Sequence, residues 1–489
     1  MKNWKEEAII DEVLAEFAEL AKIPRPSGHE KAAGDYLEER FSQLGAAVSR
    51  DEKGNLRADL PASPGGEEKP RVILQSHMDM VCAAEPGRPF NALTDPIRLI
   101  RGENTLTADG TSLGSDDGTG IGIILYLFKH REDFLHGPLR AIITVDEEAG
   151  MTGARALAED WLTDAKYLLN IDSENVDELT IGSAGSINLD FLRKISFEPI
   201  SPREGSAFEI KLSGLLGGHS GECIGLGRGN ALRIMAFFLT ELAASAVDYR
   251  LASFEGGDAR NAIPAEAAAV IVTTSLEAEL KKIAGRAGKK LQKLYPADKG
   301  GVVTVRSVPL PAAAAGAEDT LALIGLLTNL HTGVYSMSPE VPGLVETSAN
   351  IGQVIWPEQS EEGTARVTFM PRSAIDGRLA EFRMSGALLA AATGWQLEAG
   401  EISPGWAPRT ESSLAEVISR VYREQNGAPM KVGAIHAGLE CGFHARKAPE
   451  LDIVSIGVTT RDIHSPRETL ELDTVPVEVK LIARSIEEL

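Results

Sequence analysis

The spacing of apolar residues over the first 185 positions switches between the period of a helix and the short apolar runs of buried strands. An amphipathic pattern predicts a helix over residues 5 to 22, and Ser27 and Glu30 have the spacing of a capping box that would open a second helix, ending near Leu44. Further apolar patterns predict strands at 72 to 75, 139 to 145 and 167 to 171, and helices at 119 to 130 and 153 to 161. This alternation is typical of an α/β fold with a mostly parallel central sheet.

The pattern changes after the small residues 182 to 185, and a different rhythm continues to about residue 398. The elements expected there are a strand at 208 to 212, a helix at 230 to 244, and further elements at 275 to 292, 302 to 307 and 374 to 391. The Ala-rich stretch 311 to 317 is interpreted as a linker. After residue 400 the first rhythm returns, with a helix at 412 to 424, strands at 430 to 435 and 453 to 458, and a helix from Pro476.

These patterns predict two domains. One consists of residues 1–186 and 399–489, and the other, an α+β domain of residues 187–398, is inserted into it. A chain of 489 residues is long enough to bury a core in each.

The net charge of the chain disfavours some classes of binding partner. The chain has 49 Lys and Arg against 71 Asp and Glu, a net charge of −22, so nucleic acid and anionic membranes are poor partners. It has only three cysteines, an odd and sparse number that fits a reducing compartment. Neither a secretory signal nor a membrane-spanning apolar run is evident. We therefore expect a cytoplasmic protein.

The strand expected at 72 to 75 leads directly into SHMDMV, residues 76 to 81. Functional groups of parallel sheets gather just beyond the carboxyl ends of the strands, which places His77 at the edge of a site. Asp79 is spaced to hold the ring of His77 in one tautomer, as metal-bound histidines require. The alternative is that His77 is a structural histidine.

Acidic residues follow the same ends of other elements. Asp116 lies in LGSDDGTG, Glu147 and Glu148 lie in VDEEAG after the strand at 139 to 145, and Asp172 lies in NIDSE after the strand at 167 to 171. A helix-capping turn is the alternative for Asp116, and a solvated acidic surface is the alternative for the glutamates. Adjacent carboxylates repel one another, and bound cations would relieve that repulsion.

Together with His464 in HSPRE, these residues supply two histidines and three carboxylates, enough ligands for two divalent ions that share one carboxylate. Mixed nitrogen and oxygen ligands favour Zn²⁺, with Mn²⁺ or Co²⁺ as alternatives.

The ordered set of motifs resembles the co-catalytic metallopeptidases related to aminoacylase and carnosinase, in particular the aminoacyl-histidine dipeptidase branch. The strings that carry the resemblance are SHMDMV, LGSDDGTG, DEEAGM, NIDSE, GGHSG, RNAIP, HAGLECG and HSPRE. The resemblance spans nearly the whole chain and implies a zinc-peptidase catalytic domain interrupted by a lid and dimerisation domain. We accordingly expect a homodimer.

The resemblance also assigns roles to the metal-binding residues. It implies that Asp116 bridges the ions, that His77 and Asp172 complete one site, and that Glu148 and His464 complete the other. Glu147 is then the catalytic base. SDDG adds Asp117 beside Asp116, and VDEEAG adds Asp146 beside the glutamates, so the sequence leaves open which acid binds which ion.

Five further residues are expected at the substrate. His219 in GGHSG is a candidate to stabilise the oxyanion and, lying in the inserted domain, would need domain closure or a second subunit to reach the metals. Asn261 resembles a substrate-contacting lid position, and Arg372 in MPRSA is the candidate clamp for a substrate carboxylate. In HAGLECG, His436 and Glu440 resemble the substrate-side segment, with Glu440 meeting the free amino group. For these residues the alternative is a structural role, in a turn, in packing or at the surface.

These observations predict metal-dependent hydrolysis of dipeptides, chiefly of the Xaa-His type, with a small peptide as substrate. One alternative is an amidohydrolase that deacylates N-acyl amino acids at the same site. Another is a binding protein that has the fold but no metal. A nucleic-acid binder would conflict with the net charge.

Overall fold

The computed structural model describes residues 4–201, 203, 205–358, 363–409 and 411–489. The chain forms two compact units. Unit 1 comprises Met1–Ser183, Trp406–Ala434 and Leu439–Leu489, and unit 2 comprises Ala184–Gly405 and Ile435–Gly438. The short segment Ile435–Gly438, which the sequence pattern did not separate from its surroundings, is grouped with unit 2. Each unit has its own hydrophobic core.

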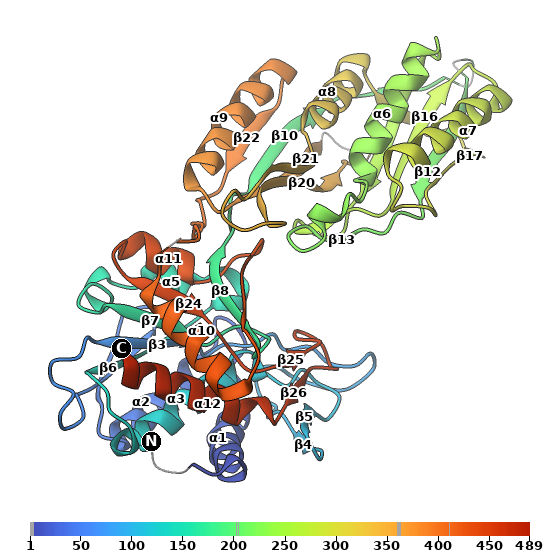
Figure 1. The fold of residues 1–489 in the computed structure, drawn as a ribbon. Coiled ribbons are helices and arrows are strands. Elements are labelled where there is room, and N and C mark those ends of the chain that lie inside the picture. The colour runs from blue at the N-terminus through green and yellow to red at the C-terminus, as the bar shows by residue number, and fades with distance from the viewer. Residues whose placement is uncertain (1–3, 202, 204, 359–362, 410) are drawn as a thin grey trace. The chain divides into compact units, whose positions relative to one another are not determined.

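Unit 1 is built on an eight-stranded sheet whose centre is parallel (Figure 1). The central strands, in spatial order, are β6 (Leu139–Thr144), β3 (Val72–His77), β7 (Tyr167–Asn170) and β24 (Asp452–Ser455), and each pairs in parallel with its neighbour. Beyond β6 lie β2 (Leu56–Leu60) and β1 (Ala47–Arg50), and beyond β24 lie β8 (Glu178–Ser183) and β23 (Lys431–Ile435). β6 and β3 are buried along their whole length, which explains their uninterrupted apolar runs.

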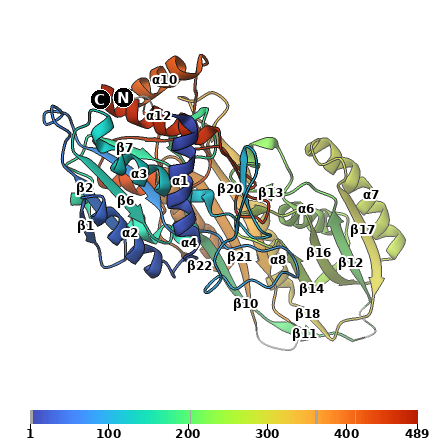
Figure 2. The same ribbon diagram turned by 90° about the horizontal axis from the view of Figure 1, so that it is seen from below.

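Helices cover this sheet and complete the core of unit 1. They are α1 (Glu6–Ala21), α2 (Lys31–Gln43), α3 (Ser115–Lys129), α10 (Ser413–Asn426), α11 (Cys441–Lys447) and α12 (Thr474–Glu488), with the short α4 (Glu147–Gly150) and α5 (Thr152–Ala156). The first and last helices of the chain are packed together, because α1 contacts α12 as well as α3 (Figure 2). A four-stranded sheet adds β4 (Leu99–Arg101), β5 (Thr105–Ala108), β25 (Thr460–Arg461) and β26 (Thr469–Glu471).

Unit 2 is an antiparallel sheet covered by a row of helices. The strands along its main path are β17 (Val302–Val308), β12 (Ser206–Ser213), β16 (Ala267–Thr273), β14 (Tyr249–Gly256), β20 (Val345–Ile355), β21 (Gly363–Ser373), β10 (Leu189–Ile195) and β22 (Gln396–Ala399). β19 (Gly333–Met337) pairs with β20, and β9 (Gly185–Ser186) pairs with β21. The helices α7 (Glu277–Leu294), α6 (Ala231–Ala244), α8 (Ala317–Asn329) and α9 (Asp376–Thr393) lie side by side in that order (Figure 1).

Two pairs of short strands complete unit 2. β13 (Gly218–His219) pairs with β15 (Ala262–Ile263), and β11 (Phe197–Pro199) pairs with β18 (Ala313–Ala315). The linker prediction for 311 to 317 is therefore wrong. Ala313, Ala314 and Ala315 form a buried strand, in which their small side chains pack in the interior of unit 2.

Two other local predictions are corrected. The capping box at Ser27 and Glu30 is absent, because Ser27 donates to Asp79 and Glu30 accepts from the backbone of Gly28 and Asp146. The helix expected over 153 to 161 is shorter, and ends at Ala156 before a single 3-10 turn, Glu159–Trp161. The other predicted helices and strands are confirmed within a few residues. Within the described ranges, no helix combines the length and apolar character needed to cross a membrane.

Candidate metal centre and substrate-binding residues

His77 is the last residue of β3 and is almost completely buried, with 1% of its surface exposed. Its Nε2 lies 2.9 Å from Asp116 Oδ1 and 3.4 Å from Asp172 Oδ1. Its Nδ1 faces Asp79 Oδ1 at 3.4 Å, longer than a usual hydrogen bond. The parallel pairing of β3 and β7 accounts for the approach of His77 to Asp172. His77 ends β3 and Asp172 comes just after β7, so both lie at the carboxyl ends of neighbouring strands.

Asp116 lies at the start of α3, where the backbone is still non-helical. Its two carboxylate oxygens face different histidines: Oδ1 faces His77, and Oδ2 lies 3.2 Å from His464 Nε2. His464 Nε2 is also 2.9 Å from the carboxylate of Glu148. The structure thus brings the five residues expected to bind metal into one cluster, with Asp116 between the two histidines.

Two overlapping groups in this cluster place three candidate ligand atoms close enough together to hold a metal ion. One is His77, Asp116 and Glu148, and the other is His77, Asp117 and Asp172; within each group the candidate ligand atoms lie within 4.8 Å of one another. Asp117 is buried, and its carboxylate accepts a hydrogen bond from Ser76. The second acid of SDDG therefore belongs to the cluster.

The electrostatics of the cluster are those of a site short of positive charge. Burial raises the pKa of Asp172 to about 7 and that of Asp117 well above its usual value. Burial also raises the pKa of Asp116, but hydrogen bonds from His464 and His77 bring it below the usual range. Hydrogen bonds to Asp116 and Glu148 raise the pKa of His464 to about 11. Oxygen and nitrogen donors crowded in this way fit divalent cations, which would offset the mutual repulsion of the carboxylates.

Glu147 and Glu148 are neighbours in sequence but have different surroundings. Glu148 contacts His464, whereas burial and nearby acids raise the pKa of Glu147 well above its usual value, and His77 only partly opposes this. Their backbone N–H groups donate to the two carboxylate oxygens of Asp79, at 3.0 and 3.1 Å. Asp79 therefore fixes the position of both glutamates, a contact that its spacing from His77 did not predict.

Glu440 is completely buried in unit 1, where one carboxylate oxygen accepts from Gln75 Nε2 and from Thr144 Oγ1, each at 2.6 Å. Its other oxygen has no hydrogen-bond partner. Burial raises the pKa of Glu440 to about 8. Sequence reasoning missed Gln75 and Thr144, although polar residues inside completely buried strands were a usable signal.

The other expected substrate-binding residues lie in unit 2. His219 in β13 is paired with Ala262, and the carbonyl of Asn261 accepts from Ser220 N at 2.8 Å. Arg372 in β21 lies opposite Ser348, whose hydroxyl is 2.7 Å from His436 Nε2. These contacts gather two histidines and a guanidinium within one unit.

Arg372 and the two histidines of this group in unit 2 differ in charge near neutral pH. Burial, and then Arg372, lower the pKa of His436 to about 4, and the same two causes lower the pKa of His219. Burial lowers the pKa of Arg372 only to about 10, and its Nε has no hydrogen-bond partner. Near neutral pH the group therefore has one buried cation beside neutral imidazoles, which suits binding of a carboxylate.

Comparison with known proteins identifies the family. The chain matches the model of peptidase family M20/M25/M40 over residues 73–488. The chain belongs to this peptidase family. It is 34% identical over 461 residues to the cytosol non-specific dipeptidase of Escherichia coli (strain K12), covering 94% of this chain and 93% of that relative.

Solved structures agree with membership of family M20/M25/M40. The crystal structure of aminoacylhistidine dipeptidase from Vibrio alginolyticus has a TM-score of 0.87 and 34% sequence identity, and covers 98% of this chain and 96% of that one. The aminopeptidase PepT of Bacillus cereus ATCC 10987, at 18% identity and a TM-score of 0.55, shares the fold. The α/β fold with an inserted domain is therefore the M20 peptidase fold.

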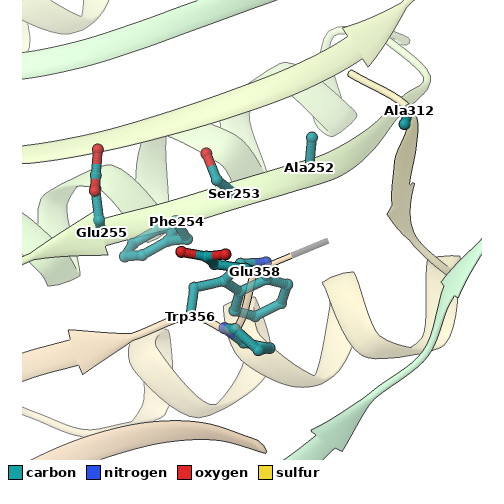
Figure 3. A pocket seen from close by; sticks show the side chains of 8 residues that line it. Ala252, Ser253, Phe254, Glu255, Ala312, Trp356 and Glu358 are labelled. Atoms are coloured by element: carbon teal, nitrogen blue, oxygen red, sulfur yellow. The ribbon is translucent and has the colours of Figure 1, made fainter. Parts of the chain in front are cut away.

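Two other features of this M20 peptidase lie apart from the His77 cluster. A cavity of about 540 Å³ in unit 2 is lined by Phe254, Glu255, Trp356 and Glu358, among others, and by none of the residues expected at the site (Figure 3). His444 in unit 1 is completely buried without a hydrogen-bond partner for either ring nitrogen. Neither has the grouped donors of the His77 cluster.

Proposed function

We propose that this M20 peptidase hydrolyses dipeptides, with Xaa-His dipeptides among its substrates, by means of two divalent metal ions. The observation that carries the proposal is the position of Asp116 between two histidines. One of its carboxylate oxygens faces His77 and the other faces His464. The similarity to two proteins named as dipeptidases, over 94% and 98% of the chain, supports the substrate class.

We assign one ion to His77 and Asp172, the other to Glu148 and His464, and the shared position to Asp116. Zn²⁺ is the proposed metal, with Mn²⁺ or Co²⁺ as alternatives, because the donors are both nitrogen and oxygen. When bound, such ions polarise the peptide carbonyl and lower the pKa of water.

We assign proton transfer to Glu147. It takes a proton from the attacking water and delivers it to the leaving amide nitrogen. Glu147 suits this task because it adjoins the proposed ligand Glu148 in sequence but, among the described contacts, makes none with His464, so its carboxylate is free to accept and release a proton. Asp79 holds Glu147 in place through the backbone N–H of that residue.

We assign recognition of the two charged ends of a dipeptide to different residues. Arg372, with His436 and Asn261, would bind the carboxylate, and Glu440 would bind the free ammonium group. His219 would donate a hydrogen bond to the developing oxyanion, since a buried neutral imidazole can present an N–H. We also propose that the protein is a homodimer and that it is located in the cytoplasm. The proposed location rests on the name of the Escherichia coli relative.

The test is an activity assay on the purified protein with a panel of dipeptides, including Xaa-His and others, after loading with Zn²⁺, Mn²⁺ or Co²⁺. Each dipeptide is paired with its N-acetylated form. We expect the free dipeptides to be cleaved and the acetylated forms to be poor substrates, because acetylation removes the charge that Glu440 would meet.

Preference for the acetylated forms would favour the deacylase alternative. Absence of bound metal after loading, measured by elemental analysis, would favour a binding protein. Either result would contradict the proposal.

A further inference from the structure

The loop that carries Asp116 is held by a single buried carboxylate. Glu468 has 2% of its surface exposed and accepts hydrogen bonds from four successive backbone N–H groups. Its Oε2 accepts from Leu113 at 2.8 Å and from Gly114 at 3.0 Å, and its Oε1 accepts from Ser115 at 2.8 Å and from Asp116 at 3.4 Å. Without Glu468, these buried donors would lose their acceptor.

The same loop is held from another direction by Arg25, which has 1% of its surface exposed. Its Nη2 donates to the carbonyl of Gly114 at 2.6 Å, and its Nη1 donates to the carbonyls of Met78 at 2.9 Å and Asp79 at 2.8 Å. Gly114 has a φ of +72°, and a Cβ there would lie 2.6 Å from Arg25 Nη2. Glycine is therefore required at the point where Arg25 meets the loop.

These two residues connect three segments that are distant in sequence. Glu468 follows His464 by four residues in the same loop, and the carbonyls of Met78 and Asp79 follow directly after His77. The segments of both histidines are thus tied to the loop of Asp116, one through Glu468 and the other through Arg25. Burial lowers the pKa of Arg25, and nearby acidic groups, Glu468 among them, partly oppose this.

We propose that Arg25 and Glu468 are positioning residues that hold the Asp116 carboxylate with one oxygen towards each histidine, so that two cations bind at the same time. The inference rests on the proposed function. Asp116 Oδ1 is 2.9 Å from His77 and Oδ2 is 3.2 Å from His464, so a small rotation of the carboxylate would favour one histidine over the other. Metal sites tolerate displacements of only about 0.5 Å, and residues behind the ligands set such positions.

The test is the metal-binding stoichiometry of Glu468→Gln. A glutamine keeps the size of the side chain but turns an NH₂ group towards two of the four N–H donors. We expect the wild-type protein to bind two Zn²⁺ ions and Glu468→Gln to hold one, with the second bound about 10- to 100-fold more weakly. The apoprotein is titrated with Zn²⁺ in competition with a chromogenic chelator, and Glu450→Gln, at an exposed position, is the matched control.

Arg25→Lys provides an independent variant, because an ammonium group keeps the charge but cannot replace the planar fork that reaches three carbonyls. It too should weaken the second ion, whereas Arg98→Lys at an exposed position should not. Circular dichroism and the Tm of the apoprotein establish that each variant is folded. If Glu468→Gln does not fold, Glu468→Asp takes its place, since its shorter side chain cannot reach all four donors.

Two bound ions of wild-type affinity in folded variants at both positions would overturn the inference and leave the proposed function intact. A lower apoprotein Tm without a change in metal affinity would do the same, because it would mean that these residues only stabilise the fold. A wild-type protein that binds no second ion would overturn both.

Discussion

At the scale of single residues, the site separates carboxylates that the sequence places side by side. Glu148 contacts His464, and Glu147 contacts neither histidine by an ion pair or hydrogen bond among those described. Both glutamates begin the short helix α4, and Asp146 and Met151 on either side of it have left-handed backbones, with φ of 56° and 52°. Adjacent acids can thus take different tasks, one as metal ligand and the other as proton carrier.

We expect Glu147→Gln to lower kcat at least about 10²-fold while both metal ions stay bound, because it removes a proton carrier and no ligand. Asp116→Ala should lose metal as well as activity. Metal content and kcat are measured on the same preparations, with Glu159→Gln at an exposed position as control. Equal loss of metal in Glu147→Gln would contradict the assignment.

Arg372→Met should raise KM for dipeptides about 10- to 100-fold, since a charged hydrogen bond to the substrate carboxylate is lost. The effect should be much smaller for dipeptide amides, which have no terminal carboxylate. Arg366→Met is the matched control, because Arg366 lies on the same strand, β21, but is exposed. The same rise in KM for acids and amides would argue against a carboxylate clamp.

At the scale of elements, helix α11 joins the candidate site to the core. Glu440 immediately precedes it, and its buried face contains Cys441, Phe443 and His444. Burial lowers the pKa of His444 to about 3, so this side chain is neutral in the folded protein across the physiological range.

We expect His444 to make the fold sensitive to acid. As the pH falls below 6.5, the ordinary pKa of histidine, the unfolded chain binds a proton that the folded chain excludes until about pH 3, so stability decreases with falling pH. When the pH is lowered from 6.5 to 5, the free energy of unfolding of the wild type should therefore fall by about 2 kcal/mol more than that of His444→Leu. Urea unfolding of the apoproteins at both pH values measures this.

His29→Leu, at an exposed position, is the control for this experiment and should behave as the wild type does. An identical pH dependence in His444→Leu and wild type would contradict the expectation.

At the scale of the whole molecule, the long insertion of residues 184–405 leaves unit 1 and returns to it at two residues that pair with each other. Ser183 N donates to the carbonyl of Trp406 at 2.8 Å, and Trp406 N donates to the carbonyl of Ser183 at 2.9 Å. Unit 1 also has a large core of its own. The long insertion between these two residues is therefore not needed to close the chain of unit 1.

We expect a chain in which a short Gly-Ser turn replaces residues 184–405 to fold cooperatively and bind metal, because all five expected ligands lie in unit 1. It should not cleave dipeptides, since His219 and Arg372 are removed. Thermal unfolding with and without Zn²⁺ should show a Tm raised by the metal. A chain that folds but does not bind metal would contradict the ligand assignment.

The sequence by itself determined the α/β alternation, the buried strands β3, β6 and β7, and the candidate residues at their carboxyl ends. Strand burial and helical periodicity are local properties, and a parallel sheet brings successive carboxyl ends to one edge. Motif order added a family resemblance that the comparisons confirm.

Only the tertiary structure decided which partners meet across the chain. Ser27 has the local spacing of a helix cap but donates to Asp79, and alanines 313 to 315 resemble a linker but pair as a buried strand. The hold of Glu468 on the Asp116 loop spans more than 350 residues. A polar group forms hydrogen bonds with the groups that the fold places near it. Its partner therefore depends on contacts between distant segments, which a local sequence pattern does not contain.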